Sequence, residues 1–129
     1  MDLGLEGRVA MVTGASNGLG KQAAQSLARE GCKVSVCARG QERLDAVVSE
    51  FRAMGYQVHG TQADVTVDAD ARRFYQDTLD SLGQPDILVN NVGGSLSRED
   101  IVGTSVDDFM ATFDLNLFGG FQLMKLVIP

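Results

Sequence analysis

Three glycines near the N-terminus have the spacing of a phosphate-binding turn. Residues 13–20 read Thr-Gly-Ala-Ser-Asn-Gly-Leu-Gly and lie between an apolar run and a segment of helical periodicity. Glycine lets the backbone approach a phosphate and adopt positive φ, and a helix that begins here presents free N–H groups and its positive dipole end. A plain connecting loop is the alternative, but the position at a first strand-to-helix turn favours a diphosphate site. The candidate contacts are Gly14, Ser16, Asn17, Gly18, Leu19 and Gly20.

The residues after the second apolar run bear on which dinucleotide such a turn would bind. An NAD site normally has a carboxylate at the end of the second strand, where it holds the ribose hydroxyls. Ala38 stands at that position, and Arg39 follows it. A guanidinium there can make a charge-assisted contact with the 2′-phosphate of NADP, to which Ser16 and Asn17 could add donors. The pair predicts NADP(H) as the preferred cofactor, with NAD(H) as the alternative. Without Ala38 beside it, Arg39 would read as a solvated loop residue.

Strand-like and helix-like segments alternate along the chain. Short apolar runs predict strands at 8–13, 33–38, 57–62 and 87–90. Apolar residues at helical spacing predict a helix after each strand, and the first three helices should end at Gly31, Gly55 and Gly83. Ser105, with Asp108 three residues on, resembles a capping box that opens a long fourth helix over 106–128.

This alternation predicts an α/β fold. Strands that alternate with helices of this length pair in parallel through right-handed crossovers, with helices on both faces of the sheet. We therefore expect a Rossmann-type, doubly wound parallel sheet in a three-layer α/β/α arrangement with strand order 3-2-1-4. Residues 1–129 would form one domain, truncated because the pattern stops after the fourth strand and its long helix. A flavodoxin-like signalling domain shares the alternation but gives no reason for the glycine turn.

Four motifs in this order resemble the short-chain dehydrogenase/reductase family. Residues 13–20 match its Thr-Gly-x-x-x-Gly-x-Gly turn, and Asp64-Val65 resembles its adenine-contacting pair. Residues 90–93 resemble its Asn-Asn-Ala-Gly signature with Val92 in place of alanine, and 115–117 resemble the segment that carries its asparagine. The resemblance implies an oxidoreductase that moves a hydride between nicotinamide and a small carbonyl or alcohol substrate. It adds to the candidate cofactor contacts Asp64, Val65, Asn90, Val92 and Gly93.

Of the catalytic groups that the resemblance implies, only Asn116 has a candidate here. In the family a tyrosine exchanges the proton, a lysine lowers its pKa, a serine holds the substrate oxygen and an asparagine positions a water. No Tyr-x-x-x-Lys pair is present, since Tyr56 precedes Gly60 and Tyr75 precedes Leu79 at that spacing. We expect the chain to supply the cofactor-binding half and to be inactive alone. A dinucleotide-binding module without catalysis is the alternative, as a buried amide bonded to backbone is for Asn116.

Charge and hydropathy limit the partners. The formal net charge of −6 argues against nucleic acid and anionic lipid, which both need clustered Lys and Arg. The longest uncharged apolar stretch, 115–124, is far shorter than the roughly 20 residues that a membrane span requires. The N-terminus has no basic region before an apolar run, so it is not a secretory signal.

The cysteines and the histidine indicate a reducing compartment and no metal. Cys32 and Cys37 are an odd number of residues apart near one strand, so they should point to opposite faces and cannot form a disulfide with each other. Free thiols suit the cytoplasm. With His59 as the only histidine, no zinc cluster can be assembled.

The long fourth helix is apolar on two arcs, which must be covered by something. One arc consists of Phe109, Phe113, Leu117 and Met124, and the other of Met110, Phe121 and Ile128. We therefore expect a homo-oligomer through 106–128. The substrate is left open, because a ketone, alcohol, steroid, sugar or acyl thioester is equally compatible with these residues.

Overall fold

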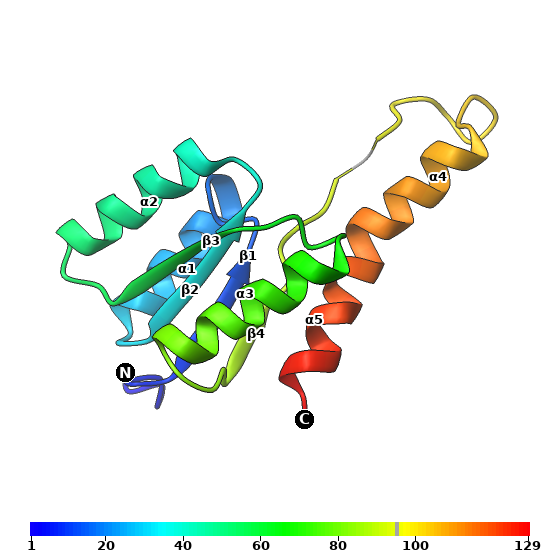
Figure 1. The fold of residues 1–129 in the computed structure, drawn as a ribbon. Helices are drawn as coiled ribbons and strands as arrows, with labels where there is room; N and C mark the ends of the chain where they lie inside the picture. Colours follow the sequence, from blue (N-terminus) through cyan, green and yellow to red (C-terminus); the bar gives the residue numbers. More distant parts are fainter. Residues whose placement is uncertain (95) are drawn as a thin grey trace.

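A computed structural model describes residues 1–94 and 96–129 as a parallel sheet flanked by helices (Figure 1). The strands are β1 (Val9–Thr13), β2 (Lys33–Ala38), β3 (Val58–Gln62) and β4 (Ile87–Val89). The helices are α1 (Gly18–Arg29), α2 (Gln41–Ala53), α3 (Asp68–Ser81), α4 (Val106–Phe113) and α5 (Gly119–Val127), with a π-helical segment η1 (Asp114–Phe118) between the last two. The strand order is β3-β2-β1-β4, which confirms the predicted topology.

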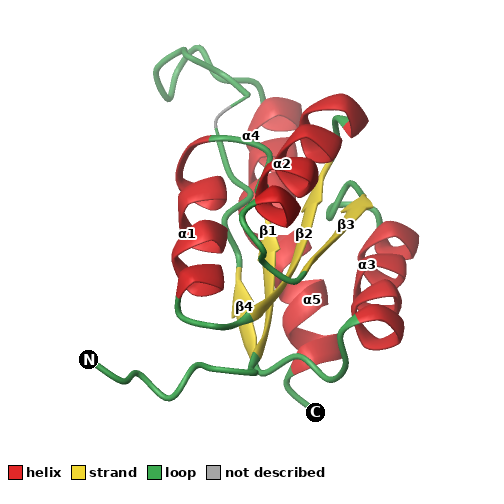
Figure 2. Ribbon diagram, turned by 90° about the vertical axis from the view of Figure 1, so that its left-hand side faces the viewer, coloured by secondary structure: helices red, strands yellow, loops and turns green. Residues whose placement is uncertain are grey.

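Helices cover both faces of the sheet, as Figure 2 shows. Val12, Val34 and Val36 pack in one buried cluster with residues of α1 and α2. Met11 and Cys37, their neighbours along β1 and β2, belong to a second cluster with residues of α3 and α5. Successive side chains of a strand point to opposite faces, so β1 and β2, which are covered on both sides, are buried along nearly their whole length. The predicted three-layer arrangement is confirmed.

The carboxyl ends of the strands are level with one another. Thr13 at the end of β1 is the register partner of Cys37 in β2, and Ala38 is that of Gln62 in β3. Val12 is likewise the partner of Val89 at the end of β4. The segments that leave the four strands therefore begin at one edge of the sheet, where ligands of open parallel sheets bind.

The two cysteines lie on opposite faces, as their spacing predicts. Cys32 is buried in the cluster under α1 and α2, and Cys37 in the cluster under α3 and α5. Both are free thiols. Helices α1, α2 and α3 also end just before the predicted glycines, Gly31, Gly55 and Gly83.

The segment predicted as one helix over 106–128 is divided in the structure. Ser105 caps α4 by accepting a hydrogen bond of 3.1 Å from the Asp108 N–H, as predicted. The wider turns of η1 then interrupt the regular helix before α5 begins. Within η1 the side-chain amide of Asn116 donates to the Thr112 carbonyl of the preceding turn at 2.8 Å. Inserted side-chain bonds of this kind are a recognised cause of irregular helical turns.

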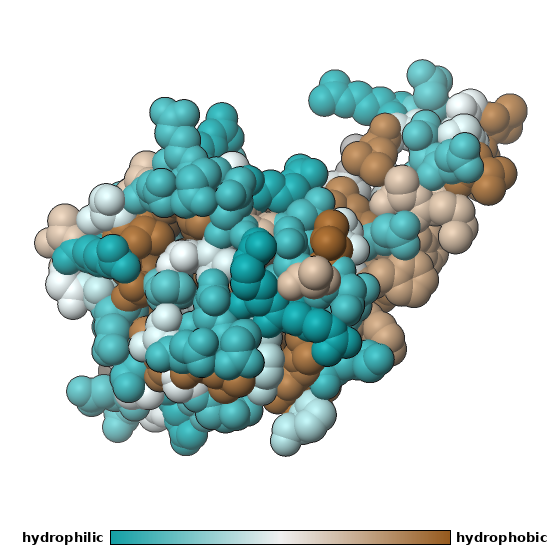
Figure 3. All heavy atoms as spheres, in the orientation of Figure 1, coloured by the Kyte–Doolittle hydropathy of each residue, from teal (hydrophilic) through white to brown (hydrophobic). Residues whose placement is uncertain are grey.

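The apolar arcs of this helical segment are exposed in the chain, as predicted. Phe109, Phe113 and Leu117 are 55%, 43% and 50% exposed, and Ile128 is 77% exposed. Figure 1 shows α4 projecting away from the sheet, and Figure 3 shows apolar residues gathered over this end of the molecule. No helix in residues 1–94 and 96–129 combines the length and hydropathy needed to cross a bilayer.

Candidate dinucleotide-binding site

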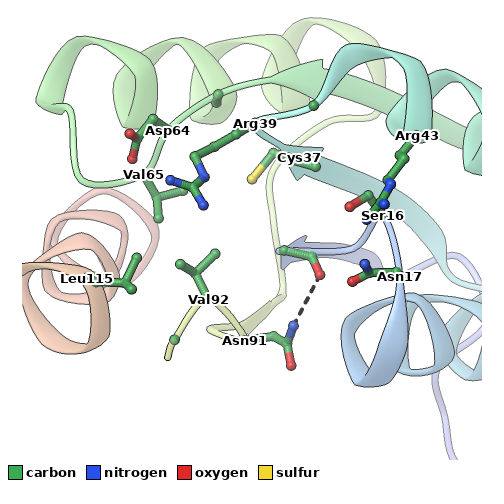
Figure 4. A pocket seen from close by; sticks show the side chains of 15 residues that line it. Ser16, Asn17, Cys37, Arg39, Arg43, Asp64, Val65, Asn91, Val92 and Leu115 are labelled. Carbon is green, nitrogen blue, oxygen red and sulfur yellow. Dashed lines mark hydrogen bonds between the residues drawn. The ribbon is translucent and has the colours of Figure 1, made fainter. Parts of the chain in front are cut away.

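A cavity of about 510 Å³ opens at the edge of the sheet where the strands end (Figure 4). That volume is in the range of small-molecule and cofactor sites. Its wall comes from the turn after β1, the ends of β2 and β3, the segment after β4 and the η1 turn. The lining residues are Gly14, Ser16, Asn17, Cys37, Ala38, Arg39, Gly40, Arg43, Ala63, Asp64, Val65, Asn91, Val92, Gly93 and Leu115.

Eight of the predicted contacts line this cavity and five of the predicted site residues do not. The eight come from four separate segments: Gly14, Ser16, Asn17, Arg39, Asp64, Val65, Val92 and Gly93. The five others are Gly18, Leu19, Gly20, Asn90 and Asn116, whose places are described below. The other seven lining residues were not anticipated as contacts, namely Cys37, Ala38, Gly40, Arg43, Ala63, Asn91 and Leu115. Two of these residues could have been found from the sequence. Asn91 belongs to the Asn-Asn-Val-Gly segment, and Arg43 is a second cation four residues after Arg39.

The glycine turn leaves the start of α1 open toward the cavity. Gly14 and Gly18 adopt φ of +62° and +55°, a region that other residues rarely enter, and α1 begins at Gly18 as predicted. Asn17 is the N-cap residue, but its side chain makes no capping bond. The first N–H groups of α1 therefore have no side-chain acceptor, as an anion site at a helix N-terminus requires. The Leu19 side chain is 78% exposed, so only its backbone can serve the site.

Gly20 is needed for packing rather than for lining the cavity. A Cβ at this position would overlap the Gly14 carbonyl and lie 2.5 Å from Nδ2 of Asn91. The missing side chain lets the first turn of α1 approach the loop that precedes it. Glycine at this point of a dinucleotide turn commonly allows close contact of helix and strand.

Thr13 and Asn91 join the two sides of the cavity. The buried Thr13 hydroxyl accepts hydrogen bonds from the N–H groups of Asn91 at 2.9 Å and Val92 at 3.2 Å. The Asn91 amide in turn donates to the Gly14 carbonyl at 3.2 Å. These bonds hold the turn after β1 against the segment after β4, so both walls are fixed without a ligand.

Asp64 and Val65 provide a charged and an apolar group at the end of β3. The Thr66 hydroxyl and backbone N–H donate to Oδ1 of Asp64 at 2.6 and 3.0 Å, and the first of these bonds is the main cause that lowers the Asp64 pKa below its ordinary 3.8. The positive charge of Arg39 lowers that pKa further. Val65, Val92 and Leu115 lie around the same part of the cavity in Figure 4. The ionised carboxylate of Asp64 can accept a hydrogen bond from an amino group, and the apolar side chains beside it can pack against a planar ring.

Two arginines line the cavity from separate elements. Arg39 is exposed just after β2, and its guanidinium lies on the side of Asp64 and Val65 (Figure 4). Arg43 comes from the first turn of α2 and points toward Ser16 in the glycine turn. Ala38, where an NAD site would place a carboxylate, is buried and neutral. The mouth of the cavity is therefore cationic, which suits a phosphorylated ligand.

Cys37 contributes an inert thiol. Burial raises the pKa of this thiol to about 12, although a hydrogen bond with the Gly14 backbone lowers it in part. A thiol with such a pKa stays protonated at neutral pH and is a poor nucleophile.

Asn116 does not line the cavity but holds the segment that does. Its Oδ1 accepts from the Gly94 N–H at 2.9 Å, and its Nδ2 donates to the Gly94 carbonyl at 2.6 Å. A Cβ on Gly93 would lie 2.6 Å from the same Oδ1, so this contact requires glycine there. The amide is bonded to backbone, as the alternative interpretation supposed, but it is exposed in the chain rather than buried.

Asn90 faces α5 instead of the cavity. A Cβ on Gly120 would come within 3.2 Å of the Asn90 side chain, so the two residues are in close approach. Asn90 therefore helps to seat α5 against the end of β4, and its predicted contact with a cofactor stays a prediction.

The family model for short chain dehydrogenases matches residues 8–129. The 7alpha-hydroxysteroid dehydrogenase of Escherichia coli K12 is 33% identical over 128 residues, which are 99% of this chain and 49% of that protein. A tropinone reductase homolog of Arabidopsis thaliana is 32% identical over 126 residues, covering 97% of this chain and 47% of that protein. The chain thus spans about half the length of the curated relatives it matches.

Solved structures show the same fold. A hydroxysteroid dehydrogenase from Escherichia coli aligns with a TM-score of 0.90 and 33% identity, covering 97% of this chain and 52% of that one. The actinorhodin polyketide ketoreductase with NADPH aligns with a TM-score of 0.88 and 32% identity, covering 94% and 46%. Because the family match runs through every strand and helix described above, the chain belongs to the short-chain dehydrogenase/reductase family of oxidoreductases.

Proposed function

We propose that residues 1–129 form an incomplete NADP(H)-binding domain of an enzyme that transfers a hydride between nicotinamide and a carbonyl or alcohol group of a small molecule. The observation that carries the proposal is the cavity at the start of α1, with an uncapped helix end, two guanidinium groups and the neutral Ala38 at the end of β2. Two structural neighbours are complexes with NADPH, which supports a phosphorylated dinucleotide over NAD(H).

The lining residues suggest how each part of the dinucleotide would be held. The N–H groups at Gly18, Leu19 and Gly20 would bind the diphosphate at the start of α1. Asp64 and Val65 would contact the adenine, with Asp64 as acceptor for its amino group. Val92 and Gly93, at the end of β4, would lie along the nicotinamide side. When bound, the nicotinamide donates or accepts the hydride.

Asn116 is proposed as the structural and catalytic asparagine of the family. In this structure its amide fixes Gly94, next to the lining residue Gly93. Holding that segment would keep the nicotinamide side of the cavity open and aligned. We propose that the contribution of Asn116 to turnover depends on its two hydrogen bonds to Gly94.

Within these 129 residues no tyrosine is followed by lysine at the family's spacing. We therefore propose that they bind cofactor and do not by themselves reduce a carbonyl. The second candidate, a dinucleotide-binding module without catalysis, is favoured by the same observation. The two differ in whether a further part of the protein supplies the proton donor. If the protein isolated from its natural source has an intact mass well above 13.8 kDa and reduces a carbonyl compound, the enzyme hypothesis is supported. A mass equal to that value without turnover supports the module.

A second copy of the chain is the proposed macromolecular partner. Three aromatic residues of α4 and η1 are exposed, Phe109, Phe113 and Phe118, and the ring centroids of Phe109 and Phe113 are 5.1 Å apart. Surfaces of this kind are typical of association sites. We place the protein in the cytoplasm because its two free thiols suit a reducing compartment.

Calorimetric titration of the full chain with NADPH and with NADH tests the proposal. We expect saturable binding of one NADPH per chain, with weaker binding of NADH. Tighter binding of NADH would overturn the preference, and no binding of either would overturn the cofactor assignment.

A further inference from the structure

A carboxylate of α3 reaches back to the segment that lines the cavity. Asp70 lies in the first turn of α3, at the position where the acidic residue of a capping box accepts from the N–H group of the N-cap residue. The N-cap residue here is Val67, but Oδ2 of Asp70 accepts instead from the backbone N–H of Asp64 at 2.9 Å. The Asp70 side chain therefore leaves its own helix and holds the backbone of a cavity residue.

Arg73, in the next turn of α3, holds this carboxylate in place. Its guanidinium lies 3.5 Å from Oδ1 of Asp70 and also donates to the backbone carbonyl of Gln62 at the end of β3. The Asp70 side chain is 27% exposed, whereas that of Asp68 in the same turn is 57% exposed. Water therefore competes less for the Asp70 carboxylate, and its hydrogen bond to the Asp64 N–H is strengthened by partial burial.

The contacts of α3 support the cavity wall from outside. The Gln62 side chain donates to the Arg39 carbonyl at 2.9 Å, which extends the same set of bonds to the end of β2. Asp70 and Arg73 line a second cavity of about 410 Å³, whose wall includes Arg39 and Asp64 of the main one. Figure 4 shows the Asp64 carboxylate and the Arg39 guanidinium on the same side of the main cavity. Two side chains outside the main cavity thus hold the backbone of its wall.

We propose that Asp70, held by Arg73, is a positioning residue for the adenine side of the cofactor. The inference rests on the proposed binding of NADP(H). Asp70 binds the backbone N–H of Asp64, the Val67 N–H donates to the Asp64 carbonyl at 2.9 Å, and Thr66 donates to Oδ1 of the side chain. The direction of the Asp64 carboxylate is therefore set before the cofactor arrives. Loss of the Asp70 bond frees this backbone and weakens recognition of the base, while the diphosphate site at the start of α1 stays intact.

The test compares NADPH with its hypoxanthine analogue, in which an oxo group replaces the amino group of the base. Both dinucleotides are titrated calorimetrically into the full chain. The oxo group would set one acceptor against another at Asp64, so the unmodified chain should prefer NADPH about fivefold or more. Asp70→Ala should reduce this preference to within about twofold, chiefly by weakening the binding of NADPH. A merely structural role would lower both affinities alike and leave their ratio unchanged.

Asp68→Ala is the matched control. Asp68 is an acidic residue of the same turn and forms an ion pair of 2.8 Å with Arg72, so its removal changes the charge at the start of α3 equally. This variant should keep the preference for NADPH. Asp70→Asn retains an acceptor oxygen for the Asp64 N–H and should keep most of the preference. If Asp70→Asn loses as much of it as Asp70→Ala, the positioning role of this hydrogen bond is overturned.

The outcomes separate this inference from the proposed function. If the unmodified chain prefers NADPH and Asp70→Ala keeps that preference, or if the unmodified chain binds both dinucleotides equally, the inference is overturned and the cofactor assignment stands. If neither dinucleotide binds, the proposed function itself fails. Thermal melting checks that each variant stays folded. Should Asp70→Ala unfold, Arg73→Ala decides, because it frees the Asp70 carboxylate and must lower the preference; an unchanged preference would overturn the inference.

Discussion

Asn116 binds both polar groups of Gly94, accepting from its N–H at 2.9 Å and donating to its carbonyl at 2.6 Å. The amide also donates to the Thr112 carbonyl within its own helical segment. One side chain therefore connects the interrupted helix to the segment after β4 that lines the cavity. The position of the cavity wall and the irregular turns of η1 depend on the same residue.

Replacing Asn116 by alanine should destabilise the chain and weaken cofactor binding. Three hydrogen bonds are lost at an exposed position, so we expect the free energy of unfolding to fall by about 1 kcal/mol. Urea denaturation measures the loss, and NADPH titration measures the effect on the wall at Gly93. Asn116→Asp keeps the acceptor but places a carboxylate oxygen against the Gly94 and Thr112 carbonyls, so this repulsion should make it no more stable than the alanine variant. Unchanged stability and unchanged NADPH binding in both variants would show that the hydrogen bonds between Asn116 and Gly94 do not hold the cavity wall.

Gly20→Ala should disrupt the turn that begins α1. The added methyl group would overlap the Gly14 carbonyl and crowd the Asn91 amide, neither of which can move without breaking the bond between them. Overpacking of this kind typically costs about 1–3 kcal/mol, and NADPH affinity should fall with it. Gly40→Ala is the control for stability, because a Cβ there meets nothing within 4 Å. Equal melting temperatures for the two variants would contradict the packing role of Gly20.

Asp64 should make the folded chain sensitive to acid. Its pKa is lowered in the folded state, chiefly by the Thr66 hydroxyl, so the unfolded chain takes up the proton first as the pH falls. The stability that this carboxylate provides is therefore complete above its ordinary pKa of 3.8 and is lost as the pH falls through the lower folded value. Thr66→Val removes the main bond and should raise the Asp64 pKa, as carboxyl NMR titration would show. An unchanged Asp64 pKa in that variant would mean that the bond does not hold the charge.

Phe113→Asp should favour the monomer. Phe113 is 43% exposed on α4 beside Phe109, and a carboxylate there would be desolvated if two copies paired through this surface. Gel filtration over a range of concentrations should show association of the unmodified chain and a constant, smaller size for the variant. If the unmodified chain elutes as a monomer at every concentration, association through this surface is refuted.

The order of strands and helices could be predicted because it depends on local patterns. Alternating apolar runs, helical spacing and terminal glycines are properties of short segments, and the covering of both sheet faces follows from them. The capping of α4 by Ser105 was likewise visible in four consecutive residues. The start of α1 at Gly18 was predictable for the same reason.

The features that were missed depend on residues far apart in the sequence. The bond between Asn91 and Gly14 joins positions 77 apart, and the one between Asn116 and Gly94 joins positions 22 apart. Neither bond has a local pattern, so neither could be predicted from the sequence. Arg43 was missed because its helix had to be placed next to the glycine turn before its side chain could be assigned to the cavity.

We propose that the cavity at the start of α1 binds a dinucleotide and that its cationic mouth selects a 2′-phosphate. Competitive calorimetry of NADPH and NADH on the full chain measures this selection. We expect one NADPH site per chain and an affinity for NADPH about tenfold or more above that for NADH, since a charge-assisted bond is made only to the former. Equal affinities, a preference for NADH or no saturable binding would contradict it.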